Sequence, residues 1–194
     1  KATEILQELT PVDLANLKYY TFEKGLFAGV DNVLISATGY TGSGGVEIYF
    51  DDKPENVEKI WNAIFEVGTP KGLKPIGLAA RDTLRLEKGF CLYGNELGDT
   101  NSEALKQEKE AGVKRRLVGI EMIDRGIPRH GYQLSDNDGN EIGIITSGTQ
   151  SPTLGKAIAI AYVNTANSQE GNEVNVIVRD KPLKAKVVKM PFVI

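Results

Sequence analysis

The sequence predicts an α+β protein, in which an antiparallel sheet with helices is followed by a small antiparallel β-barrel. Three observations support this fold class. Apolar and polar residues alternate in several segments up to Phe50, helical spacing dominates between Pro54 and Lys88, and short alternating segments return at regular intervals from Arg115 onward. The change from helical to alternating periodicity indicates two modules.

The first predicted elements are a short helix and three strands. Ile5, Leu6 and Leu9 recur at helical spacing, and Thr10-Pro11 ends this helix before Asp13 caps a short turn. The strands that follow span residues 19–30, 33–40 and 46–50, with residues 29–32 as the first connection. Three strands in succession predict an antiparallel meander.

Two helices come next, and we expect both to back the sheet. Residues Pro54 to Val67 carry apolar side chains at i, i+3, i+4, i+7 and i+8, which predicts that Trp61 lies in the core. The second helix spans Gly77 to Lys88. One of its faces carries Arg81, Asp82 and Arg85. From the pattern alone, Arg81 could equally form an ion pair with an acid or have a functional role.

A glycine-rich segment from Thr38 to Gly45 precedes the third strand. Its small side chains let the backbone turn tightly or let a ligand approach closely. Alternation then places Glu47 and Tyr49 on the face opposite to Val46, Ile48 and Phe50. Phosphate-binding loops lead into a helix, whereas this segment leads into a strand. The pattern alone therefore favours a hairpin with an exposed glutamate over a ligand site.

The second half of the chain predicts the barrel. Residues Ala104 to Ala111 are charged and helical, and short strands follow from Arg115, separated by turns at 138–139, 167–171 and 180–182. The predicted domains are an α+β module at 1–100, a helical linker at 101–114 and a β-barrel at 115–194.

Composition excludes several classes of function. The net charge is −3, with acids and bases interspersed, so no basic footprint for nucleic acid is present. The apolar runs are far shorter than the roughly 20 residues of a membrane helix. One cysteine, Cys91, excludes an intramolecular disulfide and a cysteine cluster for zinc, and we interpret it as a small buried hydrophobic residue. Because the sequence starts with neither a signal-peptide core nor an initiator Met, we expect it to be an internal fragment.

Two polar features are interpreted as structural, and no metal site is predicted. His130 is the only histidine and has no Ser, Cys or carboxylate in motif spacing, which excludes a histidine-based triad. Residues 136–140 resemble the start of a calcium loop, but position six is Glu141 instead of glycine and position twelve is Ser147 instead of glutamate. A polar hairpin turn is the better interpretation.

Several motifs, in fixed order, closely resemble those of the T-protein family, the aminomethyltransferases of the glycine cleavage system. The motifs are TGYTGSGGVEIYF at 38–50, GLAARDTLRLEKGFCLYGNEL at 77–97, KRRLVGIEMIDRGIPRHGY at 114–132, EIGIITSGTQSPTLGKAIAIAYV at 141–163 and KMPFV at 189–193. The resemblance covers nearly the whole chain, and several motifs in order are far more specific than one.

The resemblance implies a tetrahydrofolate-dependent transferase. T-proteins take the aminomethyl group carried on the lipoyl arm of the H-protein, transfer its methylene to tetrahydrofolate and release ammonia. The resemblance also implies a bacterial cytoplasm or a mitochondrial matrix as the location. In the family, the acid of the V-E-I strand and the arginine of the A-A-R-D helix belong to the folate site, which assigns Glu47 and Arg81 to it. Tyr40 matches a tyrosine of that pocket, and Tyr49 is a further candidate because it shares the face of Glu47.

The sequence departs from the family pattern at three places. A family stretch is missing where Thr100 joins Asn101, the essential aspartate of the family lies in a region before the match to Lys1, and the family tail beyond Ile194 usually adds a tyrosine. We therefore assign no catalytic residue and expect these residues alone to be inactive. Two alternatives stay open: the folate-binding module of a dimethylglycine or sarcosine dehydrogenase-like flavoenzyme, and a non-enzymatic folate-binding protein.

Overall fold

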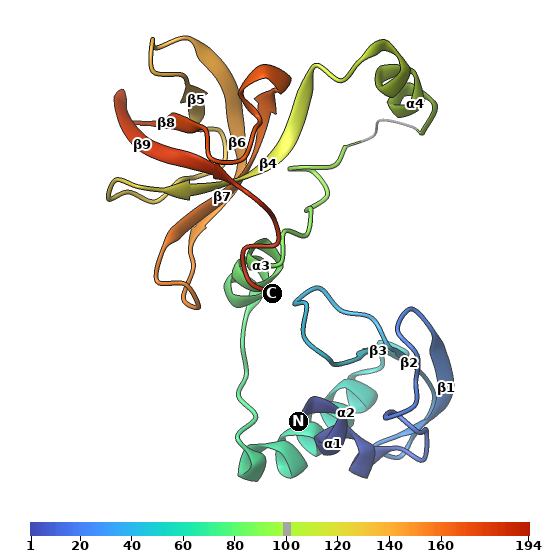
Figure 1. Ribbon diagram of the computed structural model, residues 1–194. Helices are drawn as coiled ribbons and strands as arrows, with labels where there is room; N and C mark the ends of the chain where they lie inside the picture. The colour runs from blue at the N-terminus through green and yellow to red at the C-terminus, as the bar shows by residue number, and fades with distance from the viewer. Residues whose placement is uncertain (99–101) are drawn as a thin grey trace. The chain divides into compact units, whose positions relative to one another are not determined.

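The computed structural model describes residues 1–98 and 102–194 and divides the chain into two units, Lys1–Gly77 and Leu78–Ile194 (Figure 1). The predicted domain boundaries around the linker at 101–114 stay a prediction. The junction between Thr100 and Asn101, where the resemblance predicts missing family residues, lies outside the described residues.

The first unit contains the predicted meander. Its elements are α1 (Ala2–Leu6), the 3₁₀ helix η1 (Gln7–Leu9), β1 (Phe22–Phe27), β2 (Val30–Ser36), β3 (Glu47–Tyr49), α2 (Pro54–Gly68) and the 3₁₀ helix η2 (Thr69–Lys71). The strands pair antiparallel in the order β1-β2-β3, which confirms the meander. The predicted first connection at 29–32 is wrong, because the turn lies at Ala28 and Gly29, whose φ angles are 50° and 72°, and β2 already begins at Val30.

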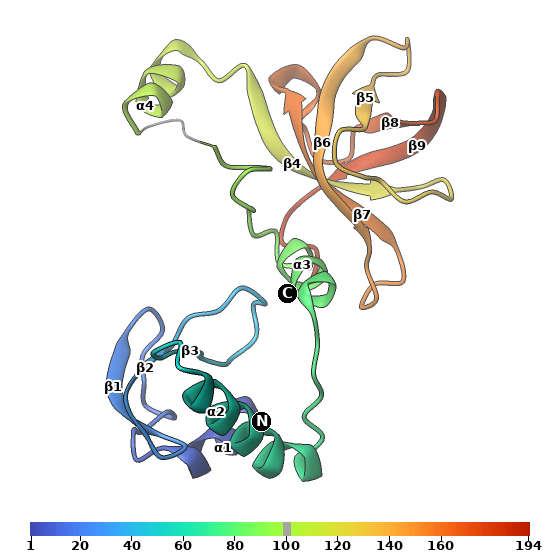
Figure 2. The ribbon, with the colours of Figure 1, turned by 180° about the vertical axis from the view of Figure 1, so that it is seen from behind.

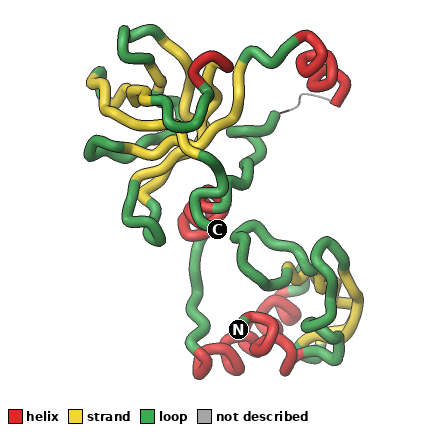
Figure 3. The backbone as a smooth tube through the Cα atoms, viewed as in Figure 1, coloured by secondary structure: helices red, strands yellow, loops and turns green. Residues whose placement is uncertain are grey.

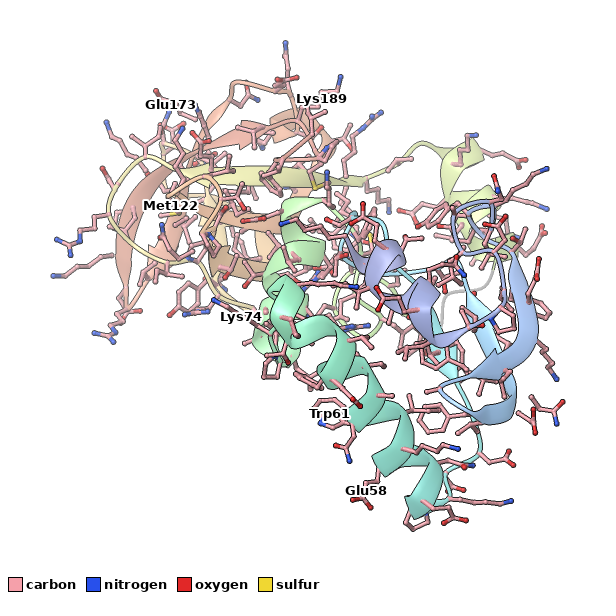
Figure 4. The ribbon with its side chains drawn as sticks, turned by 90° about the horizontal axis from the view of Figure 1, so that it is seen from below. Glu58, Trp61, Lys74, Met122, Glu173 and Lys189 are labelled. Atoms are coloured by element: carbon pink, nitrogen blue, oxygen red, sulfur yellow. The ribbon has the colours of Figure 1, made fainter. Side chains whose placement is uncertain are left out.

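One face of this sheet packs against helices. Phe27, Val33 and Ile35 are buried in one cluster with Ile60 of α2. The prediction that Trp61 lies in the core is wrong, since 57% of its surface is exposed on α2 (Figure 4). The apolar stripe of α2 is wider than the face that meets the sheet. Trp61 instead packs beside Phe65, with ring centroids 4.7 Å apart.

The second unit is built around a closed antiparallel barrel, as predicted (Figure 3). Its strands are β4 (Arg115–Met122), β5 (Gln133–Ser135), β6 (Glu141–Gln150), β7 (Ala157–Asn164), β8 (Glu173–Val178) and β9 (Lys181–Val188). They close in the order β4-β7-β6-β5-β8-β9. The unit also contains α3 (Leu78–Glu87), α4 (Ser102–Ala111) and the 3₁₀ helix η3 (Thr165–Asn167).

Helix α3 packs on the outside of the barrel. Its Leu86 is buried with Ile158 and Ile160 of β7, and the C-terminal segment, with Phe192, packs against the same cluster. The C-terminus lies beside α3 in both views (Figures 1 and 2). The prediction that this helix backs the first sheet is therefore wrong: α3 belongs to the barrel unit. No helix of the described residues is long and apolar enough to cross a membrane.

Candidate functional site

The exposed face of the first sheet carries the predicted glutamate. Strand pairing places Glu47 of β3 opposite Ser36 of β2, and Ser36 opposite Phe22 of β1. The next row on this face consists of Lys24, Leu34 and Tyr49. Val46, Ile48 and Phe50 pack toward the core instead. The structure thus confirms that Glu47 and Tyr49 share a face opposite the apolar one.

The Thr38 hydroxyl holds the Glu47 carboxylate. The Thr38 hydroxyl donates to Glu47 Oε2 and lies 3.0 Å from Ser36 Oγ. The negative charge of Glu47, followed by burial and a hydrogen bond to Glu47, raises the pKa of the Tyr49 phenol. The phenol therefore keeps its proton beside the carboxylate. A carboxylate has about four lone-pair sites, so the Thr38 donor leaves room for further ones.

The glycine-rich loop between β2 and β3 has the open backbone that the sequence predicts. Among the glycines of this loop, only Gly42 has a positive φ, which is 67°. A Cβ atom added at Gly39, Gly44 or Gly45 would meet nothing within 4 Å. Tyr40 is half-buried in the same loop. Three of these glycines therefore leave free space beside the chain, which suits a close approach of a ligand.

Arg81 lies on α3, in the second unit, and its side chain is exposed. The structure places Glu47 and Tyr40 together in the first unit. The assignment of all three residues to one site stays a prediction.

A buried charge network next to Arg81 was not predicted. Arg85 is 1% exposed and donates to Asp82 Oδ1 (2.8 and 2.6 Å), to Glu96 Oε2 (3.2 Å) and to Ser147 Oγ (2.7 Å). Glu96 is also buried and accepts from the Leu92 N–H at 2.7 Å. The network joins α3 and the loop after it to β6. Only the i, i+3 spacing of Asp82 and Arg85 could be found in the sequence.

Glu87 makes a second polar connection between α3 and the barrel unit. Its carboxylate accepts hydrogen bonds from the Ser151 hydroxyl and, at 2.9 Å, from the Thr153 hydroxyl. Its backbone oxygen accepts from the N–H groups of Phe192 and Val193 at 2.9 and 3.1 Å. The end of α3 is thus fixed both to the loop after β6 and to the C-terminal segment.

The polar features interpreted as structural have structural partners. His130 Nδ1 lies 2.7 Å from the Thr146 carbonyl oxygen. Asp136 accepts from the N–H groups of Asp138 and Asn140 at 3.0 and 2.8 Å, as in a polar hairpin turn. Burial raises the pKa of the Cys91 thiol, which is half-buried. Among residues 1–98 and 102–194, no group of three or more His, Cys, Asp or Glu residues could hold a metal ion.

Several surface hollows lie on the barrel unit, and two of them are compared with the sheet face. One, of about 360 Å³, is lined by residues that include His130, Ile144 and Tyr162, and the other, of about 330 Å³, by residues that include Arg116 and Lys189. Neither is lined by Glu47, Tyr40 or Arg81. The first hollow is also lined by Glu96 of the Arg85 network. Because neither hollow contains an assigned site residue, the exposed sheet face remains the stronger candidate.

Two protein families match the chain. Residues 1–112 match the family described as "GCVT N-terminal domain", and residues 115–193 match "Glycine cleavage T-protein C-terminal barrel domain". The two matches together cover nearly every residue.

Curated relatives carry one name. A protein of Flavobacterium psychrophilum named "Aminomethyltransferase" is 52% identical over 211 positions, which cover 99% of this chain and 58% of the relative. A protein of Phocaeicola vulgatus with the same name is 53% identical over 213 positions, with the same two coverages. The chain thus spans somewhat over half the length of these relatives.

A solved structure has the same fold. The crystal structure of glycine cleavage system aminomethyltransferase T from Bartonella henselae superposes with a TM-score of 0.81 at 29% identity. It covers 100% of this chain, which in turn covers 57% of that protein.

Proposed function

Because the chain belongs to the glycine cleavage T-protein family, we propose that the whole protein is an aminomethyltransferase of the glycine cleavage system. It transfers the methylene of an aminomethyl group to tetrahydrofolate and releases ammonia. The proposed partner is the H-protein, whose lipoyl arm carries the aminomethyl group. The names of the relatives support this activity, and their bacterial origin supports a cytoplasmic location. Since the chain covers 58% of each relative, the activity is proposed for the whole protein.

The observation that carries the proposal is the carboxylate of Glu47 on the exposed sheet face. A pterin presents an exocyclic amine and a ring N–H side by side, and one ionised carboxylate can accept both hydrogen bonds. Thr38 fixes the carboxylate and occupies part of its acceptor capacity. The remaining capacity is what two pterin donors need.

The other assigned residues complete the proposed folate site. Tyr40 lies in the loop that leads to β3 and packs on the bound folate. Arg81 offers a rigid fork of donors for pterin or glutamate-tail oxygens. Tetrahydrofolate supplies the nitrogen atoms that accept the methylene group, while Glu47 and Arg81 hold and orient it. Orientation of this kind contributes to catalysis by bringing the reacting groups together.

The two alternatives receive no support from the relatives reported above. A flavoenzyme module or a non-enzymatic folate-binding protein would have relatives with other names, whereas both curated relatives are named aminomethyltransferase.

A turnover assay of the whole protein tests the proposed activity. With aminomethylated H-protein and tetrahydrofolate, we expect methylene-tetrahydrofolate and ammonia to form in equal amounts. Omitting either substrate, or supplying an H-protein without its lipoyl group, is the control and should abolish both products. No product with the complete mixture would contradict the proposal. Methylene transfer from dimethylglycine without H-protein would support the flavoenzyme alternative instead.

A further inference from the structure

Tyr20 has a backbone conformation that does not suit its side chain. Its φ angle is 64°, in the left-handed region that glycine adopts freely and a bulky residue rarely adopts. Its side chain is 78% exposed, so burial of the ring does not offset the strain. Strained residues of this kind occur preferentially at functional sites.

Backbone hydrogen bonds fix Tyr20 beside the Glu47 face. The Tyr20 N–H donates to the Ala37 carbonyl at 3.0 Å, and the Ala37 N–H donates to the Thr21 carbonyl at 2.9 Å. Ala37 directly precedes Thr38, whose hydroxyl donates to Glu47. The turn that carries Tyr20 is therefore attached to the segment that positions the carboxylate, within one unit of the chain.

Tyr20 forms an aromatic pair with Tyr19. The two ring centroids are 4.2 Å apart and the ring planes are inclined by 53°. A hydrogen bond with Tyr20, followed by burial and the charges of Tyr20 and Glu47, raises the pKa of Tyr19. Phe22 extends this aromatic group, because strand pairing puts it in the same row as Ser36 and Glu47.

We propose that Tyr20, supported by Tyr19, contacts the ligand held by Glu47 and packs against its flat ring. The inference rests on the proposed function, which provides a ligand with a flat heteroaromatic ring. Glu47 binds the polar edge of such a ring, and an exposed aromatic pair next to the carboxylate offers a surface for its face. Stacking on an exposed ring also explains why a tyrosine occupies a position that glycine would occupy without strain.

The test uses three variants of the whole protein, each measured by thermal melting and by calorimetric titration with 5-formyl-tetrahydrofolate. Tyr20→Gly removes both the ring and the strain, so we expect an equal or higher melting temperature and an affinity about tenfold lower. Tyr20→Leu keeps the bulk without the flat ring and should lose affinity to a similar extent. Tyr20→Phe keeps the ring and should bind within about threefold of the unmodified protein.

Two control variants test whether relief of backbone strain, or loss of any exposed aromatic ring, changes affinity by itself. Arg179 has a similar φ angle, 50°, at an exposed position of the barrel unit. Arg179→Gly relieves the strain of this angle and should raise the melting temperature without changing affinity. Trp61→Ala removes another exposed aromatic ring of the first unit, on α2, and should also leave affinity unchanged.

The outcomes distinguish this inference from the proposed function. Unchanged affinity in Tyr20→Gly, together with weak binding in Glu47→Gln, would overturn the inference and leave the proposed function standing. Unchanged affinity in Glu47→Gln would remove the basis of both. A lower melting temperature in Tyr20→Gly with unchanged affinity would assign Tyr20 a structural role. Equal losses of affinity in all three Tyr20 variants would also contradict stacking, because Tyr20→Phe keeps the ring.

Discussion

At the scale of single residues, carboxylates in this protein are stabilised in two physically different ways. Glu121 on β4 is paired with Lys156 and Lys186, whose Nζ atoms lie 3.0 and 3.1 Å from its Oε1. Glu87 is buried and accepts hydrogen bonds from hydroxyl and backbone N–H groups, without a cation of the described residues as its partner. Charge pairing between exposed groups is screened by salt, so the two glutamates should respond differently to ionic strength.

Glu121 provides a prediction on pH. Burial alone would raise its pKa, but the hydrogen bonds and charges of Lys156 and Lys186 outweigh burial and hold the pKa below the usual value of 4.5. A lowered folded-state pKa contributes stability above the unfolded-state pKa, and the contribution is lost as pH falls through the folded-state value. We expect Glu121→Gln to lower the free energy of unfolding at pH 7 by less than about 1 kcal/mol, because both lysines are about half exposed and water screens the pair.

Urea unfolding of both proteins at several pH values checks this prediction. The difference in unfolding free energy should be constant well above pH 4.5 and should shrink as pH falls below it. A difference that grows on acidification would contradict the ion-pair account of Glu121.

The sequence predicts which face of a strand some side chains occupy, but it does not predict which distant residues a side chain contacts. The face of Glu47 could be predicted, because alternation along a strand is a local property. The burial of Glu96 could not, since Ser147, which donates to it at 2.5 Å, is far away in the sequence. The left-handed φ of Tyr20 could not be predicted either, because it leaves no signal in the sequence pattern.

At the scale of elements, helix α3 shows the same division between local and distant signals. Its extent was predicted nearly to the residue, as Gly77 to Lys88 against an observed Leu78–Glu87. The prediction that it backs the first sheet was wrong, because its partners lie on the barrel. Leu86 packs against β7, Arg85 donates to a residue of β6, and Glu87 accepts from the loop between these strands. Periodicity identifies a helix, whereas the surface that it covers depends on distant contacts.

The Arg85–Glu96 pair is predicted to attach this helix and the following loop to the barrel. Both side chains are almost fully buried, at 1% and 0% exposure. Removing one partner leaves an uncompensated buried charge, so Arg85→Met should lower the free energy of unfolding by about 3–5 kcal/mol. Replacing both, as Arg85→Met with Glu96→Met, should recover a large part of that loss, because no buried charge remains.

A double-mutant cycle measured by urea unfolding checks this prediction. Lys71→Met is the control, since its ion pair with Glu8 is half-exposed and should contribute less than about 1 kcal/mol. Additive losses in the Arg85 and Glu96 single and double variants would contradict a coupled pair.

At the scale of the whole molecule, the sequence predicted the two kinds of architecture, while the predicted domain boundaries stay a prediction. Short strands at regular spacing predicted the barrel. Its closure depends on the pairing of β4 with both β7 and β9, which are distant from it in the sequence. By contacts the division falls after Gly77, whereas the family matches meet between residues 112 and 115. Glu47 and Arg81 lie in different units, and their assignment to one site stays a prediction.

The central claim is that Glu47 holds the folate, and it is tested most directly by calorimetric titration of the whole protein with 5-formyl-tetrahydrofolate. Glu47→Gln keeps the shape of the side chain but turns one acceptor into a donor that faces a pterin donor. It should weaken binding by about 2–4 kcal/mol while the variant melts at a similar temperature. Glu23→Gln, at an exposed glutamate of β1 paired with Ile35, is the matched control and should bind normally. Equal affinities of Glu47→Gln and Glu23→Gln in folded protein would contradict the account.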